Sequence, residues 1–284
     1  TLPAALTATN GMYMTGYGAE TMGRGGVNLA ISDRSLALNF NPAGIGQLQG
    51  NHVSLNLSLL APSLEYQNML NLAIDGDDKI SPLPAMAYVR GAKDSPWTWG
   101  VGFVAQGGMG ATFESESTFF GTVDQTYTEV RFMTLNPTVA YSIGEDMALG
   151  LALNLGYADA SFKFFPQTSF FNPVAPEQSF FGVNLKQAGG LQTNARRGWW
   201  WRPRPRFSVG LVYQTETDSH YEDGDLWMNF NGHPFIGETV RYDGDIDGFT
   251  FAAQAGVGVA FRPAARWMVG VDLKRYFWDD AIDS

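Results

Sequence analysis

Large apolar residues and small or polar residues alternate along much of this chain. In the stretch 147–158 every odd position carries Met, Leu or Tyr, and every even position carries Ala, Gly or Asn. The same period of two recurs, with few breaks, at 53–59, 97–103, 207–213, 249–261 and 267–273. Successive side chains of a strand point to opposite faces, whereas a helix repeats its apolar positions every 3.6 residues. With less regular runs at about 82–90, 127–142 and 180–201, the pattern predicts nine strands of about ten residues each.

The links between these strands alternate in length. Long links at about 63–81, 107–126, 161–180 and 215–247 alternate with short turns at 91–96, 144–146, 202–206 and 263–266. Barrels of the outer membrane have tight turns at one end of the strands and long loops at the other. A soluble sandwich shares the two-residue period but has no reason to keep this asymmetry. We therefore expect an all-β fold, a transmembrane antiparallel β-barrel.

Tryptophan placement agrees with this orientation. Six of the eight tryptophans lie beside predicted short turns: Trp97, Trp99, Trp199, Trp200, Trp201 and Trp267. Indole rings prefer the interface between membrane and water, where one edge is wet and the other apolar. The pattern predicts an aromatic girdle at the periplasmic ends of the strands.

The first 50 residues lack the two-residue alternation. They are rich in Gly and Asn, yet they also contain Met, Tyr, Leu, Ile and Phe. Ahead of a barrel, such a segment is either a disordered tail or a plug folded into the lumen, and its apolar content favours the plug. We expect two parts, a hatch at 1–50 and barrel strands with extracellular loops at 51–284.

Composition and charge exclude several other classes. The chain has 284 residues, 18 Lys+Arg against 28 Asp+Glu, a formal net charge of −10 and no Cys. A disulfide scaffold is therefore excluded, and the acidic balance argues against nucleic acid as a partner. An apolar content of 45% argues against disorder. No run approaches the ~18 apolar residues that a membrane-spanning helix needs.

Two runs of residues carry a family resemblance. One is the Gly-rich stretch 16–26 followed by Asn41, Pro42, Ala43 and Gly44, and the other is the block 198–213 with its Pro203-Arg204-Pro205 turn. In this order they resemble the FadL/TodX family of outer-membrane transporters for long-chain fatty acids and aromatic hydrocarbons. In that family a Gly-rich opening leads to an Asn-Pro-Ala motif just ahead of the first strand.

The resemblance implies a monomeric barrel of 14 strands in the bacterial outer membrane, with a hatch that closes the lumen. It implies passive uptake of a hydrophobic small molecule, which enters through an apolar extracellular groove and leaves sideways past the hatch. Outer-membrane lipid and lipopolysaccharide would surround the barrel, and no cofactor is implied. Nine strands would leave an open edge with unpaired backbone groups in lipid. We therefore expect the chain to lack about the last third, and to begin at a mature N-terminus because no signal peptide is visible.

A run of phenylalanines marks the link 161–181, where a solvent-facing loop should be polar. Its members are Phe162, Phe164, Phe165, Phe170, Phe171, Phe180 and Phe181. Apolar surface on that scale usually marks a binding site. We expect these rings to form the outer groove that receives the ligand, although some could simply extend the neighbouring strands into an aromatic belt.

Two further sets of residues are candidates for transport. Asn41, Pro42 and Ala43 would form a hatch turn bonded to the wall beside the lateral exit, although Asn before Pro also starts ordinary turns. Gly100 and Gly102 could allow the kink that opens the wall, or could make room for the hatch.

Strand parity places Lys186 inward, together with Asp272 and Lys274. A lumenal lysine could bind a fatty-acid carboxylate, or it could pair with an inward acid such as Asp272. Whether the cargo is an acid or a neutral hydrocarbon depends on this point, and the sequence leaves both open.

Two rival functions carry less support. No nucleophile elbow or metal-ligand spacing accompanies the three His, so we predict no enzyme and no catalytic residues. We predict no metal site either, because the run Asp243, Asp245, Asp247 lacks the Glu at the twelfth position of a calcium loop. A general porin remains the alternative, although its lumen should carry rings of charge.

Overall fold

The structure, a computed structural model, describes residues 13–31, 34–77, 79–219, 221–246 and 250–281. Within these ranges one antiparallel sheet of twelve strands dominates the molecule. Its main path runs through β1 (Gly50–Leu60), β4 (Ser81–Gly91), β5 (Trp97–Ser117), β6 (Val123–Ile143), β7 (Met147–Phe170), β8 (Phe180–Arg204), β9 (Phe207–Gln214), β13 (Gln254–Ala264) and β14 (Trp267–Tyr276).

Five short strands lie outside this path. β10 (Asp218–Ser219) and β11 (Tyr221–Asn229) pair with β8, and β12 (Thr239–Ile246) pairs with β11. β2 (Glu65–Tyr66) and β3 (Ile74–Asp75) form a separate hairpin. The sequence pattern predicted none of the five, because each is too short or too polar to show an apolar alternation.

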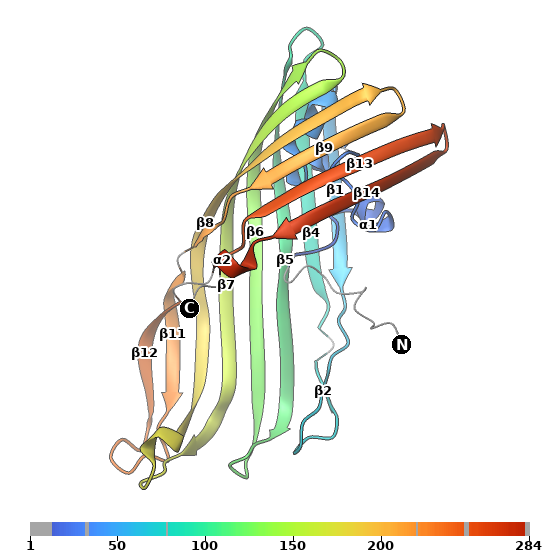
Figure 1. Cartoon of the computed structure of the whole chain (residues 1–284). Helices are drawn as coiled ribbons and strands as arrows, with labels where there is room; N and C mark the ends of the chain where they lie inside the picture. Colours follow the sequence, from blue (N-terminus) through green and yellow to red (C-terminus); the bar gives the residue numbers. More distant parts are fainter. Residues whose placement is uncertain (1–12, 32–33, 78, 220, 247–249, 282–284) are drawn as a thin grey trace.

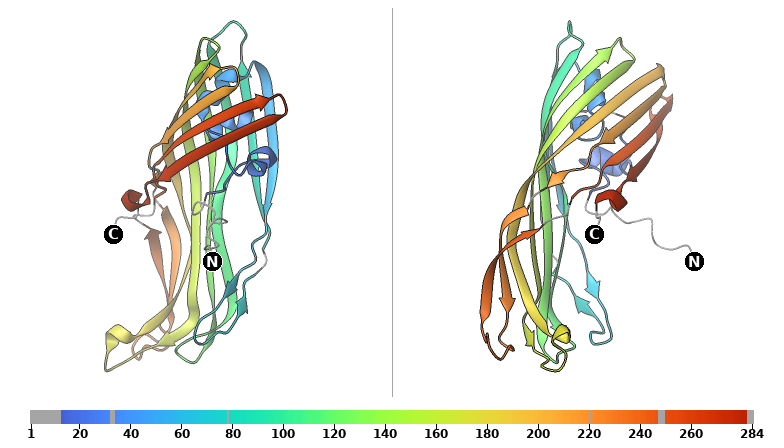
Figure 2. Two further views of the ribbon diagram at one scale, coloured as in Figure 1. Left: turned by 45° about the vertical axis from the view of Figure 1, so that its right-hand side comes forward. Right: turned by 60° about the vertical axis from the view of Figure 1, so that its left-hand side comes forward.

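The sheet curls into a trough, so that the fold is a half-barrel (Figure 1, Figure 2). The long strands β5 to β8 form its back, and β9, β13 and β14 cross obliquely at one end. The short turns after β6 and β8 lie at the upper end in Figure 1, and the connections after β5 and β7 lie at the lower end. All-β architecture and the segregation of the short turns thus follow the sequence prediction.

Each predicted segment overlaps one strand of the main path, but two predicted long links are wrong in extent. Residues 118–122 alone join β5 to β6, and residues 171–179 join β7 to β8. Strand pairing continues into both former links, for example where Glu116 lies opposite Asp124. Backbone hydrogen bonds do not depend on side-chain polarity. The apolar alternation therefore ends well before the strands do.

The predicted link 215–247 contains β10, β11 and β12. Asp243 and Asp245 of the acidic run lie in β12, while Asp247 and Gly248 lie outside the described residues.

Large apolar side chains line the convex face of the sheet, which is the reverse of a soluble protein. On β7 the exposed residues are Leu149, Leu151, Leu153, Leu155 and Tyr157, and the buried ones between them include Ala148, Ala152, Asn154 and Ala158. Small and polar residues thus line the concave face, as they do in a membrane barrel. In the part of the chain that the structure describes, no helix has the length and apolar character to cross a membrane.

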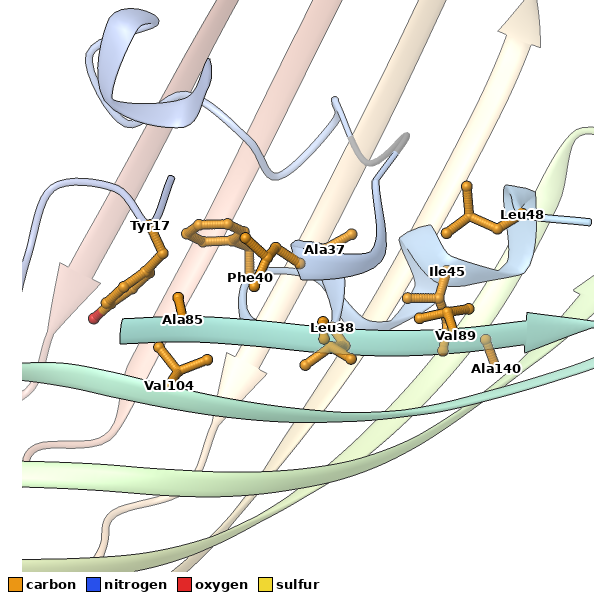
Figure 3. Close-up of a cluster of buried hydrophobic side chains, with 12 residues drawn as sticks. Tyr17, Ala37, Leu38, Phe40, Ile45, Leu48, Ala85, Val89, Val104 and Ala140 are labelled. Carbon is orange, nitrogen blue, oxygen red and sulfur yellow. The ribbon is translucent and has the colours of Figure 1, made fainter. Parts of the chain in front are cut away.

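Residues 13–31 and 34–49, here named the inner segment, lie in the trough against the concave face (Figure 2). The inner segment contains α1 (Ala19–Gly23) and two 3-10 helices, η1 (Ser35–Asn39) and η2 (Pro42–Gln47). The main apolar cluster joins it to β4, β5 and β6 through Tyr17, Leu36, Ala37, Leu38, Phe40, Ile45, Leu48, Ala85, Ala87, Val89, Val104 and Ala140 (Figure 3). Residues 1–12 of the predicted hatch lie outside the described residues. Two further short helices are η3 (Pro176–Gln178) and α2 (Trp278–Ala281).

Candidate functional site

Asn41 is the residue that ties the inner segment to the wall. Its side chain is fully buried and caps η2, because Oδ1 accepts a hydrogen bond from the backbone N–H of Ala43 at 3.2 Å. Its Nδ2 donates to the carbonyl oxygens of Leu29 (2.9 Å) and Trp199 (3.1 Å). Pro42 follows at the first helical position, where its fixed φ suits the turn. One amide therefore joins η2, the loop around Leu29 and strand β8.

Wall glycines allow the inner segment to come this close. A Cβ at Gly198 would overlap Oδ1 of Asn41, and one at Gly150 would overlap the Pro42–Ala43 peptide. A Cβ at Gly210 would overlap the carbonyl of Leu29. Backbone can approach a strand this closely only where the strand has no side chain. The Asn-Pro-Ala turn and the glycines opposite it therefore form one unit.

The two candidate gate glycines lie inside an unbroken ladder. Gly102 faces the side chain of Leu38, which a Cβ would displace, whereas Gly100 abuts the β4 backbone at Tyr88. Pairing of β5 with β6 is regular at both and shifts only further along, between Ala105 and Gly107 and again between Phe113 and Glu116. The sequence allows two roles for Gly102, a kink that opens the wall and room for the hatch. Its contact with Leu38 of the inner segment fits the second role.

A continuous row of polar side chains crosses the concave face beside the inner segment. Nε2 of Gln106 donates to Oδ1 of Asn39 at 2.5 Å and to Oγ1 of Thr134 at 2.7 Å. Thr134 donates to Asn136 at 3.0 Å. The row continues from strand to strand through Asn154 and Asn194 to Oγ1 of Thr217. The amides satisfy one another, so they cross an otherwise apolar or small-residue wall at little cost.

Arg196 is a buried cation on the same face that the sequence analysis missed. Its guanidinium donates to Oε1 of Gln214, through Nε at 2.9 Å, and to the carbonyl of Asn39. Among the ion pairs of the described residues none involves Arg196. Its even position on β8 matches that of other inward residues, and this parity is the signal that could have found it.

Tyr17 of the inner segment is buried and stays neutral. Burial raises the pKa of the Tyr17 hydroxyl above its usual value, so that it donates to the backbone carbonyl of Gln106 at 2.5 Å. Tyr17 thereby adds a further link between the inner segment and β5.

The inward position predicted for Asp272 places it under the inner segment. Its Oδ2 accepts hydrogen bonds from the backbone N–H groups of Asn28 (2.8 Å) and Leu29 (3.1 Å). Lys274 donates to the carbonyl of Gly26 at 3.5 Å. Both inward charged residues of β14 therefore bind the inner segment.

The predicted inward direction of Lys186 is wrong. The register of β7 and β8 shifts between Ala160 and Phe162, and the extra residue on β8 is Gln187, with a left-handed φ of 53°. Leu185 and Ala188 are both buried in one cluster of the concave face. Lys186, next to Leu185, therefore lies on the convex face, where its side chain is exposed.

The candidate ligand-binding phenylalanines belong to paired strands rather than to one loop. Phe162, Phe164, Phe165 and Phe170 lie in β7, Phe180 and Phe181 lie in β8, and Phe171 begins the connection. The rings form two groups at the end of the sheet opposite the short turns. In the first, Phe120 stacks on Phe180 at 4.9 Å and contacts Phe170, while Phe164 contacts Phe165 and Phe180. In the second, Phe181 contacts Phe230 at 4.7 Å and Phe171 contacts the His233 ring at 4.7 Å.

A cavity of about 390 Å³ separates the inner segment from β1, which is one edge of the main path. Tyr17 and Phe40 border it on one side, and Ser54 and Asn56 border it on the other. The cavity offers space for a small molecule beside the inner segment.

The match to a protein-family model identifies the family of this chain. The model of the outer membrane protein transport protein family (OMPP1/FadL/TodX) matches residues 1–281. The chain belongs to this family.

Solved structures of this family share the fold. The toluene transporter TbuX of Ralstonia pickettii superposes with a TM-score of 0.76 at 18% identity, over 95% of this chain and 74% of that chain. The toluene transporter TodX of Pseudomonas putida has a TM-score of 0.64 at 17% identity, over 95% and 72%. A FadL homologue of Pseudomonas aeruginosa has a TM-score of 0.68 at 12% identity, over 95% and 70%. The comparison with curated protein sequences finds no match.

Membership in the OMPP1/FadL/TodX family assigns the chain to outer-membrane transport proteins. A family of transport proteins fits a protein that is not an enzyme. In the described residues no group of three or more His, Cys, Asp or Glu is arranged to hold a metal ion.

Proposed function

We propose that this protein is an outer-membrane channel for passive uptake of hydrophobic small molecules, with residues 1–50 as its hatch and 51–284 as barrel wall and loops. One observation carries the proposal: the inner segment is bonded into the concave face of a sheet whose convex face is apolar. Such a sheet suits lipid outside and a closed passage inside. Within the membrane we expect the chain to act as a monomer.

The height of the apolar band supports integration in a bilayer. On β7 the outward residues from Met147 to Tyr157 are all large and apolar or aromatic, and Asp159 ends the run. Asp159 binds Arg131, its register partner on β6. At about 3.3 Å per residue and a tilt of about 40°, ten steps along β7 span about 25 Å, the height of a barrel's lipid-facing band. The short turns then face the periplasm.

Ligand capture would occur at the opposite, extracellular end, where the two aromatic groups lie. Phe164, Phe170 and Phe180 retain exposed ring surface, while the contact of Phe164 with Phe180 and those of Phe120 with Phe170 and Phe180 hold the rings in place. Offset and edge-on aromatic contacts favour further aromatic partners. From there a small molecule would pass the inner segment toward the cavity beside β1, and leave sideways near the β5 irregularity at Gly107.

The cargo proposed is a neutral hydrophobic molecule, with aromatic hydrocarbons ahead of long-chain fatty acids. The sequence allowed an acid because of an inward Lys186, but this lysine lies on the convex face. Lys274 and Arg196 on the concave face are occupied by carbonyl and amide oxygens. The family neighbours named as monoaromatic hydrocarbon channels agree with this choice.

The test compares uptake with conductance. Labelled toluene and labelled oleate would be supplied to bacteria that carry the protein and to matched bacteria that lack it. We expect accelerated toluene uptake and a weaker effect on oleate. In planar bilayers the purified protein should give almost no steady current, because the inner segment blocks the lumen. Large, stable current steps together with unselective uptake would instead establish a general porin.

A further inference from the structure

The convex face carries a row of polar and aromatic side chains just beyond the apolar band. Register partners from five neighbouring strands form it, and directly opposite residues share a face of the sheet. The row consists of Tyr127, Lys163, Asn184, Trp227 and Arg241. We name it the convex polar row. Lys163 lies over the Tyr127 ring, with Nζ 5.6 Å from the ring centroid.

Two irregularities create this surface. The extra residue Gln187 turns Lys186 and Asn184 outward, as shown above. A second register shift, between Phe164 and Ser169, lets the β7 backbone fold close over Gly182, where a Cβ would overlap the carbonyl of Phe165. Asn229 holds this part of the β7 backbone in place by donating to the carbonyl of Pro166 at 3.0 Å.

The folded β7 backbone becomes the wall of a cavity of about 300 Å³. Pro166, Asn184, Lys186, Trp227, Asn229 and Thr239 line it. Oδ1 of Asn184 is shielded from solvent and has no hydrogen-bond partner among the described residues. Lys186 has no ion-pair partner among them either, while Arg241 pairs with Asp225. An unpaired ammonium, an unpaired amide oxygen and an indole therefore meet in one cavity.

These groups match a phosphorylated sugar. A lysine ammonium binds phosphate as a point charge, an amide oxygen accepts from a sugar hydroxyl, and an indole packs against a sugar ring. Lys186 is the one charged residue among the described residues that line the cavity, and the acid opposite it in register, Asp225, is paired with Arg241. The local charge of the cavity therefore favours an anion, in contrast to the net charge of −10 of the whole chain.

The height of the cavity above the apolar band indicates where such a sugar would come from. Lys163 follows Asp159, the end of the apolar band, by four residues on β7, which corresponds to about 10 Å along the membrane normal. This is the depth of lipid headgroups in the outer leaflet. We propose that the cavity binds the phosphorylated saccharide headgroup of lipopolysaccharide, with Lys186 on the phosphate and Trp227 against the sugar. The proposal rests on the orientation given under the proposed function.

The test titrates delipidated protein in detergent with lipid A that carries its phosphates, and counts bound lipid by native mass spectrometry. We expect Lys186→Ala and Trp227→Leu each to weaken binding about tenfold, the loss of one charge-assisted or stacking contact. Lys79→Ala, which removes an exposed lysine paired with Glu129, and Trp267→Leu, which removes an exposed indole on β14, are the matched controls and should bind as the parent does.

Three results would overturn the proposal: equal binding by all four variants, equal binding of dephosphorylated lipid A, or binding of inorganic phosphate as tight as that of the lipid. Toluene uptake by the same variants separates the two proposals. Loss of lipid A binding with unchanged toluene uptake supports the lipid site. If the protein binds lipid A but transports no toluene, the lipid site is supported and the proposed function is wrong.

Discussion

The two ends of the trough hold their contents in opposite ways. At the short-turn end, Gly150 and Gly210 of the wall meet the backbone of the inner segment directly, and Gly198 meets the side chain of Asn41. At the other end, large rings meet one another, and two register shifts leave a cavity on the convex face. Backbone contact leaves no free space, so a change at the first end should unsettle the whole inner segment. Side-chain contact can yield, so a change at the second end should alter ligand handling alone.

The largest effect is expected when a side chain is placed at a wall glycine. Gly198→Leu would drive a side chain into Asn41 and Pro42, and we expect it to lower the free energy of unfolding by about 3 kcal/mol, the cost of overpacking. Urea titration in detergent measures this. Gly23→Leu, at a glycine with nothing within 4 Å of its missing Cβ, is the control. Equal losses in both variants would show that close backbone approach is not what matters.

A smaller effect should follow from removing the amide that ties the segment to β8. Asn41→Ala leaves the carbonyls of Leu29 and Trp199 and the N–H of Ala43 unpaired, and should cost about 2 kcal/mol of unfolding free energy. It should also raise the background current in planar bilayers, because the inner segment is held less firmly. Asn51→Ala is the control, since Asn51 is exposed on β1 and accepts one hydrogen bond from Tyr88. A silent Asn41→Ala would contradict the anchoring role.

Asp272 is the third group that holds the inner segment, after the wall glycines and Asn41. Removing its charge tests this contact. Asp272→Asn keeps the shape but weakens the hydrogen bonds from Asn28 and Leu29, and should cost about 1 kcal/mol in the same titration. Asp146→Asn, which affects an exposed pair with Arg202, should cost less than half as much. An equal loss of unfolding free energy in Asp146→Asn and Asp272→Asn would contradict the anchoring role of Asp272.

The smallest effect is expected at the aromatic end. Phe170→Ser and Phe171→Ser should each reduce toluene uptake about threefold, since each removes a ring that would contact the aromatic ligand, a contact of about 0.5–1.5 kcal/mol. Unfolding free energy should stay close to that of the parent. Phe119→Ser, at an exposed ring in the neighbouring connection, is the control. Unchanged uptake in both test variants would remove these rings from the capture site.

Much of the architecture could be predicted from local pattern, but the candidate site only in part. The alternation at 147–158 predicted both β7 and its apolar face, because parity is constant along a regular strand. Asn41 was predicted to bond to the wall, and it does so at Trp199. The polar row through Gln106, Asn136 and Asn154, by contrast, depends on which strands are neighbours and in which register, which a single strand's pattern does not contain.

By itself the sequence determined the strand period, the apolar face and the end of the sheet at which the short turns lie, since each depends on residues close together in the chain. Only the tertiary structure decided the direction of Lys186 and the purpose of the wall glycines. A single inserted residue such as Gln187 exchanges the two faces of a strand without changing the composition around it. Gly198, in turn, has its reason in Asn41, far away in the chain, and only folding brings the two together.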